Sequence, residues 1–208
     1  MNERERQERH SAISRAAYDL LAGHGYAGTS MLRIATAAKA SNETLYRWYG
    51  NKEGLFRAMV EDNAAETRLV LLRALEHGGC PRETLERVAP VFLGMLLGDR
   101  AILLNRAAAA DPTGELGAAI SAGGRAQVMP LVTGVMNRIC TDSDLQPAEA
   151  TRLFISLLVQ DRQIRRIIHN CPAPSQAEID ASCARSIQIF YRLIDNGAGS
   201  GPRSRSNA

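Results

Sequence analysis

Residues 29–56 read TSMLRIATAAKASNETLYRWYGNKEGLF, and this stretch decides the fold of the N-terminal part of the chain. Its apolar residues recur every three or four positions, which is typical of amphipathic helices. Thr29 or Ser30, and then Ser41, are placed to cap two short helices, because a hydroxyl can accept a free N–H of a first turn. The stretch therefore predicts one helix over about 30–38, a tight turn and a second helix from Ser41, which is the helix-turn-helix arrangement.

Helical periodicity continues on both sides of this stretch, and strand-like alternation of β-branched residues is absent. On the N-terminal side, Ile13, Ala17 and Leu21 form one apolar stripe, and the glycines that follow end the helix. On the C-terminal side, Gly123-Gly124 and Pro130 are expected to kink or split one long segment. Helices are expected at about 9–22, 52–77, 82–97, 99–110, 114–140, 147–169 and 176–195. The chain is therefore predicted to be all-α.

Composition indicates the general class of protein. The chain has 208 residues, of which 45% are hydrophobic and 23% charged, as in ordinary globular proteins. It lacks the apolar run of about 20 residues that a membrane span needs, and its N-terminus lacks the apolar core of a signal peptide. These features predict a soluble cytoplasmic protein without membrane contact. The polar, low-complexity segment 196–208 is predicted to be a disordered tail.

The positive charge of the chain is concentrated at its N-terminal end. Residues 1–52 carry eight Lys and Arg against five Asp and Glu, whereas residues 53–208 carry 17 of each kind. A basic excess confined to one end indicates an anionic partner there, such as a nucleic acid.

The cysteines predict no metal site. Cys80, Cys140, Cys171 and Cys183 form no Cys-x-x-Cys pair and have no metal-ligand spacing with the histidines. We expect reduced, mostly buried thiols, and neither a metal nor any other cofactor.

The outward face of the second short helix carries groups that suit DNA. Asn42 and Arg47 can form forked hydrogen bonds to base edges in a major groove. The hydroxyls of Thr44 and Tyr46 can bond phosphate oxygens. Lys52 opens the next predicted helix, where its ammonium group and the helix N-terminus both favour a phosphate.

Residues 29–56 resemble the DNA-binding domain of the tetracycline-repressor (TetR) family. The family pattern has a threonine, Ile-Ala, a turn and a serine, then Thr-Leu-Tyr, an aromatic residue and Lys-Glu before a leucine. The matching residues here are Thr29, Ile34-Ala35, Ser41, Thr44-Leu45-Tyr46, Tyr49, Lys52-Glu53 and Leu55. The resemblance covers about residues 9–60, and the run 41–49 most resembles the AefR-like branch. It implies a three-helix DNA-binding domain over 1–54 and a larger helical domain for effector binding and dimerisation over 55–195.

The pattern also separates DNA contacts from core residues. Leu45 and Trp48 are expected in the core, and Tyr49 is expected to pack against neighbouring helices. Lys39 stands where the family often has glycine, and Glu43 where it often has glycine or alanine, so the resemblance leaves the base preference open. The predicted DNA-binding residues are Thr29, Ser30, Arg33, Lys39, Ser41, Asn42, Glu43, Thr44, Tyr46, Arg47 and Lys52.

The resemblance further implies a homodimer on a palindromic DNA operator. One helix-turn-helix makes few contacts, and such units usually bind two half-sites as two-fold dimers. In this family the last two long helices of each subunit pair into a four-helix bundle. The residues expected at that interface are Leu153, Leu157, Ile164, Ile168, Cys183, Phe190 and Ile194, although in a monomer the same stripes could serve the core alone. The charged residues between them, which form interface ion pairs or a solvated edge, are Asp161, Arg162, Arg165 and Arg166.

The middle helices are expected to enclose a small-molecule site. The resemblance implies a cavity for an apolar or amphipathic effector, and flexible methionines suit an adaptable pocket. The residues expected to line it are Phe92, Met95, Leu96, Leu103, Asn105, Arg106, Met129, Val132 and Met136. Effector binding would shift the helix that joins the two domains and release the DNA, which predicts a repressor.

Three other functions are open at this point. A DNA-binding dimer without a small-molecule effector fits the same motif. A small helical enzyme would draw on Cys140, Asp161, His169 and Cys171, but no third partner is evident for His169 and Cys171. Cysteine oxidation as the signal would need an exposed thiol of low pKa, which nothing in the sequence indicates.

Overall fold

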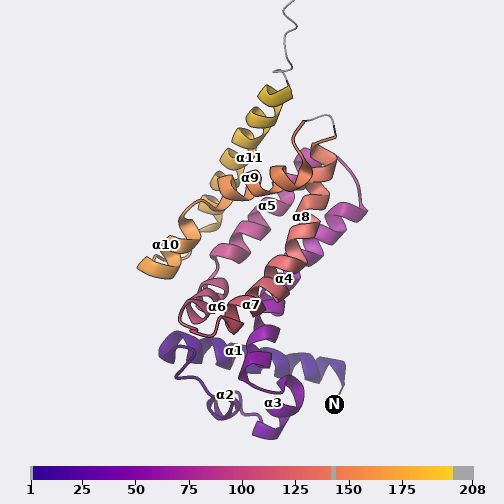
Figure 1. Cartoon of the computed structure of the whole chain (residues 1–208). Coiled ribbons are helices and arrows are strands. Elements are labelled where there is room, and N and C mark those ends of the chain that lie inside the picture. Colours follow the sequence, from indigo (N-terminus) through magenta and orange to yellow (C-terminus); the bar gives the residue numbers. More distant parts are fainter. Residues whose placement is uncertain (1, 142–143, 199–208) are drawn as a thin grey trace, which may run out of the picture. The chain divides into compact units, whose positions relative to one another are not determined.

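The computed structural model describes residues 2–141 and 144–198, and these residues are helical apart from short connections (Figure 1). The elements are α1 (Glu3–His24), α2 (Met31–Ala37), α3 (Asn42–Tyr49), α4 (Lys52–Glu76), α5 (Pro81–Leu97), α6 (Asp99–Ala109), α7 (Glu115–Ile120), the π-helix η1 (Ser121–Arg125), α8 (Ala126–Ile139), α9 (Pro147–Val159), α10 (Arg162–His169) and α11 (Gln176–Ala198). The predicted all-α class is confirmed. Residues 196–198 of the predicted tail belong to α11, and 199–208 lie outside the described residues.

Two helical segments differ from their predicted bounds, and a third is interrupted as predicted. Helix α1 begins at Glu3 because Asn2 and Glu5 form a capping box, in which each side chain accepts from the other residue's N–H at 2.8 and 3.0 Å. The segment predicted as one helix over 147–169 is two helices, since Gln160 adopts a positive φ of 50° after α9. The segment 114–140 is split, as expected, and the π-helix η1 is the interruption.

The chain forms two compact units. Unit 1 contains Met1–Ala65 and Gly98–Ala126, and unit 2 contains Glu66–Leu97 and Gln127–Ala208. Helix α4 begins in unit 1 and ends in unit 2. The predicted domain boundary after residue 54 therefore falls inside unit 1.

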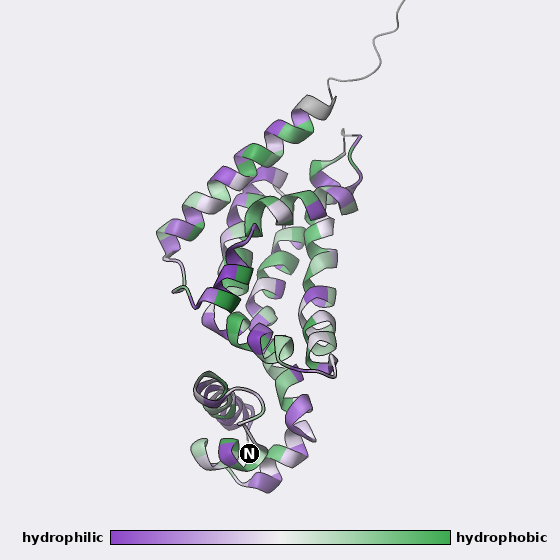
Figure 2. Ribbon diagram, turned by 60° about the vertical axis from the view of Figure 1, so that its left-hand side comes forward, coloured by the Kyte–Doolittle hydropathy of each residue, from purple (hydrophilic) through white to green (hydrophobic). Residues whose placement is uncertain are grey.

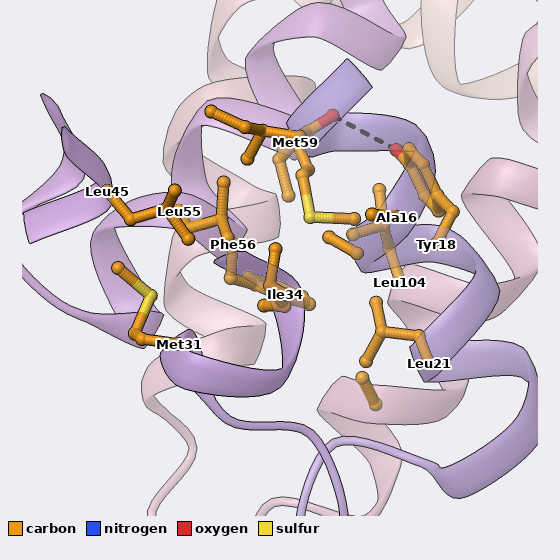
Figure 3. Close-up of a cluster of buried hydrophobic side chains, with 14 of the residues drawn as sticks. Ala16, Tyr18, Leu21, Met31, Ile34, Leu45, Leu55, Phe56, Met59 and Leu104 are labelled. Atoms are coloured by element: carbon orange, nitrogen blue, oxygen red, sulfur yellow. Dashed lines mark hydrogen bonds between the residues drawn. The ribbon is translucent and has the colours of Figure 1, made fainter. Parts of the chain in front are cut away.

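The hydrophobic core of unit 1 explains this extension. It joins apolar side chains of α1, α2 and α3 to those of the first turns of α4, including Leu55 and Phe56 (Figure 3). Leu104 of α6 and Leu116 of α7 are buried in the same cluster. These later helices remove apolar surface from water that the first three helices alone would leave exposed.

Unit 2 is built around α5, which packs against α9, α10 and α11. The rings of Phe154 on α9 and Phe190 on α11 meet edge to face, with centroids 5.4 Å apart. Hydrophobic and hydrophilic residues alternate along α11 (Figure 2), and its apolar side faces this core. Cys183, Phe190 and Ile194, which were predicted at a dimer interface, are therefore buried core residues of their own chain.

Within residues 2–141 and 144–198, no single helix is long and apolar enough to cross a membrane, and α5 and α6 meet the length and composition criteria only as a bent pair. The same ranges contain no group of three or more His, Cys, Asp or Glu side chains placed to hold a metal ion. All four cysteines are free; Cys140 and Cys183 are buried and Cys80 is exposed.

One glycine lies where two helix backbones meet. The Gly54 N–H donates to the side chain of Asn51 at 2.7 Å, which fixes the first turn of α4. A Cβ atom at Gly54 would lie 1.9 Å from the carbonyl oxygen of Tyr49, the last residue of α3. No side chain fits between α3 and α4 at this point.

We expect Gly54→Ala to lower the unfolding free energy of unit 1 by about 2 kcal/mol, because the added methyl group must displace backbone. Gly117→Ala in α7 is the matched control, since nothing lies within 4 Å of its Cβ position. It should be neutral or stabilising by up to about 1 kcal/mol, as glycine-to-alanine changes in helices usually are. Urea unfolding, followed by the fluorescence of Trp48, the only tryptophan, measures the stability of both variants. Equal stabilities of Gly54→Ala and Gly117→Ala would contradict the close approach of α3 and α4.

Candidate DNA-binding interface

Helices α2 and α3 form the predicted helix-turn-helix, and a serine caps each of them. The Ser30 hydroxyl accepts from the Arg33 N–H at 3.3 Å, and the Ser41 hydroxyl accepts from the Thr44 N–H at 3.1 Å. The hydroxyls of Ser41 and Thr44 also lie 2.8 Å apart, so Thr44 is engaged with the cap. In the turn, Lys39 has a φ of 51°, a conformation that glycine adopts freely and other residues adopt at a cost of roughly 1–2 kcal/mol.

The face of α3 opposite its core residue Leu45 is polar and open to solvent. Asn42, Glu43, Tyr46 and Arg47 are all exposed on it. Arg47 and Glu43 form an exposed ion pair at 4.0 Å, which contributes little stability and leaves both groups available to a partner. This face therefore presents an amide, a carboxylate, a phenol and a guanidinium, the types of group that contact base edges and phosphates.

Of the residues at the start of α2, Thr29 differs from its predicted roles. Ser30, not Thr29, caps the helix. Thr29 is only 4% exposed, and its hydroxyl donates to the Gly25 carbonyl at 2.8 Å, so its side chain is buried rather than directed toward a partner. Arg33 is exposed as expected, although its guanidinium donates to the Gly28 carbonyl at 2.6 Å.

Lys52 is anchored inside unit 1. Its ammonium group donates to the carbonyl oxygens of Tyr26 and Thr29 at 3.1 and 3.2 Å and lies 3.9 Å from the centroid of the Tyr26 ring. Burial, together with nearby carboxylates, raises the pKa of Tyr26 to about 12, so this ring stays neutral beside the ammonium. Lys52 thus ties the start of α4 to the loop between α1 and α2, and a phosphate contact would use only its third N–H.

The sequence did not reveal a polar junction of three helices, which we call the His10 bridge (His10, Tyr49 and Asp62). Nδ1 of His10 on α1 lies 2.7 Å from the hydroxyl of Tyr49 at the end of α3. Nε2 of His10 lies 2.5 Å from the carboxylate of Asp62 on α4. The partners stand 39 and 52 positions from His10, so no local pattern could have identified them.

The last helices of unit 2 present apolar side chains to solvent. Of the residues predicted at a dimer interface, Ile164 and Ile168 on α10 are 51% and 65% exposed, and Leu153 and Leu157 on α9 are partly buried. Leu193 on α11, which was not selected from the sequence, is 48% exposed. A single chain therefore leaves this apolar surface uncovered.

Unit 2 contains a cavity of about 430 Å³ between the end of α5, α10 and the start of α11. Arg166 is buried and donates to the carbonyl oxygens of Leu97 and Cys171. Glu178 is the one carboxylate in the lining; its hydrogen bonds from the Ser175 hydroxyl and N–H, both 2.7 Å long, lower its pKa. The rest of the lining combines apolar residues with two further arginines: Leu93, Pro172, Pro174, Ile179, Ala181, Ser182, Arg162 and Arg165.

None of the residues predicted to line an effector site borders this cavity. Leu103, Asn105 and Arg106 belong to unit 1, and the Asn105 side chain donates to the Ala101 carbonyl at 2.8 Å. The predicted residues that belong to unit 2 are Phe92, Met95, Leu96, Met129, Val132 and Met136, of which Phe92, Val132 and Met136 are buried. From the sequence, the three arginines of the cavity were instead expected to form interface ion pairs or a solvated edge.

Comparison with known proteins finds a family model that matches the helix-turn-helix region. Residues 13–59 match the family described as "Bacterial regulatory proteins, tetR family". A stretch of 43 residues is 46% identical to the uncharacterized HTH-type transcriptional regulator YdeS of Bacillus subtilis (strain 168). That stretch is 21% of this chain and 22% of YdeS, so the chain matches about a fifth of its curated relative.

The fold is similar to solved structures over most of the chain. A TetR-family transcriptional regulator from Mesorhizobium loti MAFF303099 matches with a TM-score of 0.73 and 22% identity over 90% of this chain and 96% of the other. The regulator FadR from Bacillus subtilis, solved in complex with stearoyl-CoA, matches with a TM-score of 0.69 and 14% identity over 86% of this chain and 96% of FadR. At these identities the likeness concerns the fold.

We expect Lys52→Met to lower the unfolding free energy of unit 1 by about 2 kcal/mol, because it removes two hydrogen bonds from a charged donor and a cation–π contact. If Lys52 only contacted phosphate, replacing it would not change the stability of the DNA-free protein. Lys39→Ala removes the same charge from an exposed site and should change stability by less than about 0.5 kcal/mol. Urea unfolding with Trp48 fluorescence compares the two, and equal effects would show that Lys52 does not stabilise the loop.

Proposed function

Because residues 13–59 match the tetR family of bacterial regulatory proteins, we propose that the chain is a sequence-specific DNA-binding transcriptional regulator. It acts as a repressor that a small effector releases from a palindromic operator. The exposed polar face of α3 is the observation that carries this proposal. The family consists of regulatory proteins, so the helical enzyme considered from the sequence is not retained. Its placement in the AefR-like branch stays a prediction.

The roles of the DNA-facing residues follow from their chemistry and exposure. Asn42 and Arg47 read base edges, because amide and guanidinium groups form forked hydrogen bonds in the major groove. The hydroxyl of Tyr46 and the exposed cations Arg33 and Lys39 contact phosphates. The basic excess of the N-terminal region supports this orientation toward DNA, since phosphate contacts supply much of the affinity.

A homodimer would supply the second half-site contact. The exposed apolar residues Ile164, Ile168 and Leu193 lie on the last helices of unit 2, where exposure to water is unfavourable. Covering them with the same helices of a second copy gives a two-fold arrangement, which matches the symmetry of a palindromic operator.

The effector proposed for unit 2 is an amphipathic anion. Arg162 and Arg165 bring positive charge to a cavity whose floor includes the buried side chains of Leu93 and Ile179. Guanidinium groups bind carboxylates and phosphates through paired hydrogen bonds, and the apolar floor would accommodate a hydrocarbon tail. FadR, which shares the fold, was solved with stearoyl-CoA, a ligand of this chemical type.

If the effector releases DNA, then effector binding and DNA binding are coupled reciprocally. An effector that weakens DNA binding is itself bound more weakly by the DNA complex, by the same factor. Helix α4 is the element through which the coupling can act, because one continuous helix contributes residues to both units.

We expect selection from random DNA to recover one palindromic sequence that the protein binds in a salt-sensitive manner. Arg47→Ala should weaken binding by about 1–3 kcal/mol and relax the preference at one base position, because a bidentate base contact is lost. Tyr46→Phe should weaken binding to all sequences by a smaller amount. Arg87→Ala, on the exposed side of α5, is the control and should leave affinity unchanged. No enriched sequence, or equal effects of Arg47→Ala and Arg87→Ala, would refute the DNA-reading role.

We expect dodecanoate to bind unit 2 and to reduce operator binding, whereas dodecanol, the neutral molecule with the same tail, should bind at least about tenfold more weakly. Arg165→Ala should remove most of this difference. Arg152→Ala, an exposed arginine of α9 outside the cavity lining, is the control. Calorimetric titration measures binding directly. Equal binding of the two amphiphiles would rule out recognition of the anion, and binding of neither would favour the dimer without a small-molecule effector.

A further inference from the structure

The His10 bridge joins α1, α3 and α4 within unit 1 through two short polar contacts. The side chains of His10 and Asp62 are 23% and 40% exposed, so the contact between them is partly shielded from water. Burial raises the pKa of Tyr49 to about 12, and the nearby Asp62 carboxylate acts in the same direction. The Tyr49 phenol therefore keeps its proton and can take part in the bridge as a hydroxyl group.

The bridge is compatible with both protonation states of His10. A neutral imidazole donates through Nε2 to Asp62 and accepts at Nδ1 from the Tyr49 hydroxyl. A charged imidazole donates at both nitrogens, and the Tyr49 hydroxyl then accepts. The junction therefore holds whether or not His10 carries a charge.

At its C-terminal end, α3 is held by Trp48 and Tyr49, which pack against the core of unit 1, and the guanidinium of Arg6 lies 5.9 Å from the centroid of the Trp48 ring. Leu45 is the only side chain of α3 that is fully buried, and Trp48 and Tyr49 are partly exposed. The backbone approach at Gly54 limits how closely α4 can come, but it supplies no attraction. The hydroxyl of Tyr49 is thus the polar group that attaches this end of α3 to its neighbours.

We infer that His10 is a positioning residue for DNA binding, which fixes the C-terminal end of α3 and so sets the orientation in which α3 presents Tyr46 and Arg47. The inference rests on the proposed function, since it concerns how the DNA-reading face is held. Without the bridge α3 samples more orientations, and DNA binding must then order the helix as well. Affinity falls, while the base preference, which resides in the side chains themselves, is retained.

The position of Asp62 gives the bridge a second consequence. Asp62 lies on α4, the helix that continues into unit 2. A displacement of α4 therefore moves Asp62, and through His10 it acts on Tyr49 at the end of α3. The bridge is in this way a direct connection between α4 and the DNA-reading helix.

Tyr49→Phe tests the bridge because it removes one hydroxyl and keeps the ring. We expect about five-fold weaker binding to the selected operator and about five-fold faster amide hydrogen exchange in α3, corresponding to the loss of one hydrogen bond. Tyr18→Phe is the matched control. The Tyr18 hydroxyl donates to the Met59 carbonyl at 3.2 Å and so connects α1 to α4 without touching α3 (Figure 3). It should lower stability but change operator affinity by less than about two-fold.

A double-variant cycle with His10→Ala completes the experiment. If His10 acts through Tyr49, Tyr49→Phe has no further effect on affinity or on α3 exchange in the His10→Ala background. Equal losses of affinity in Tyr49→Phe and Tyr18→Phe, or a full effect of Tyr49→Phe without His10, would overturn the inference. If the wild-type protein selects no DNA sequence, the proposed function fails. The amide hydrogen exchange of α3 tests the bridge separately from DNA binding. Unchanged exchange in Tyr49→Phe would overturn the bridge even if no DNA sequence is selected.

Discussion

A helix of eight residues does not persist in water by itself, so α3 depends on the groups that anchor it. Ser41 satisfies its first turn, Leu45 places it in the core of unit 1, and Tyr49 attaches its last turn to His10. Each of these anchors uses a side chain directed toward the core of unit 1 or along the axis of α3. Asn42, Glu43, Tyr46 and Arg47 are thereby left exposed, and the orientation of this proposed DNA-reading face is set by contacts within unit 1.

The local features of this arrangement were predictable from the sequence. The caps at Ser30 and Ser41 and the core role of Leu45 depend on neighbours within four positions, where residue type and 3.6-residue periodicity determine the outcome. The exposed residues Asn42 and Arg47 follow from the same periodicity, because they lie opposite the buried stripe. The fold class and the helix-turn-helix therefore required no knowledge of distant contacts.

Features that depend on distant partners could not be predicted. Lys52 resembles a phosphate ligand by its position at a helix N-terminus, yet the carbonyl oxygens it bonds belong to a loop more than 20 positions earlier. The break at Gln160 uses a positive φ in a residue whose type carries no such signal. An amphipathic stripe likewise does not reveal its partner: Phe190 was assigned to a second copy of the chain, but Phe154 of its own chain covers it.

The distribution of burial in unit 1 determines where strain on α4 can be relieved. Leu55, Phe56 and Met59 of α4 are almost completely buried, and α1 contributes six buried residues to the same unit. A close-packed core of this kind resists sliding, because any shift opens voids or forces overlaps. Helix α3 contributes one fully buried side chain, Leu45, besides the partly buried Trp48 and Tyr49, so displacing it costs less than displacing α1 or α4. Under the proposed function, an effector that biases α4 would act on α3 through Asp62 and His10, and the limited burial of α3 would allow it to respond.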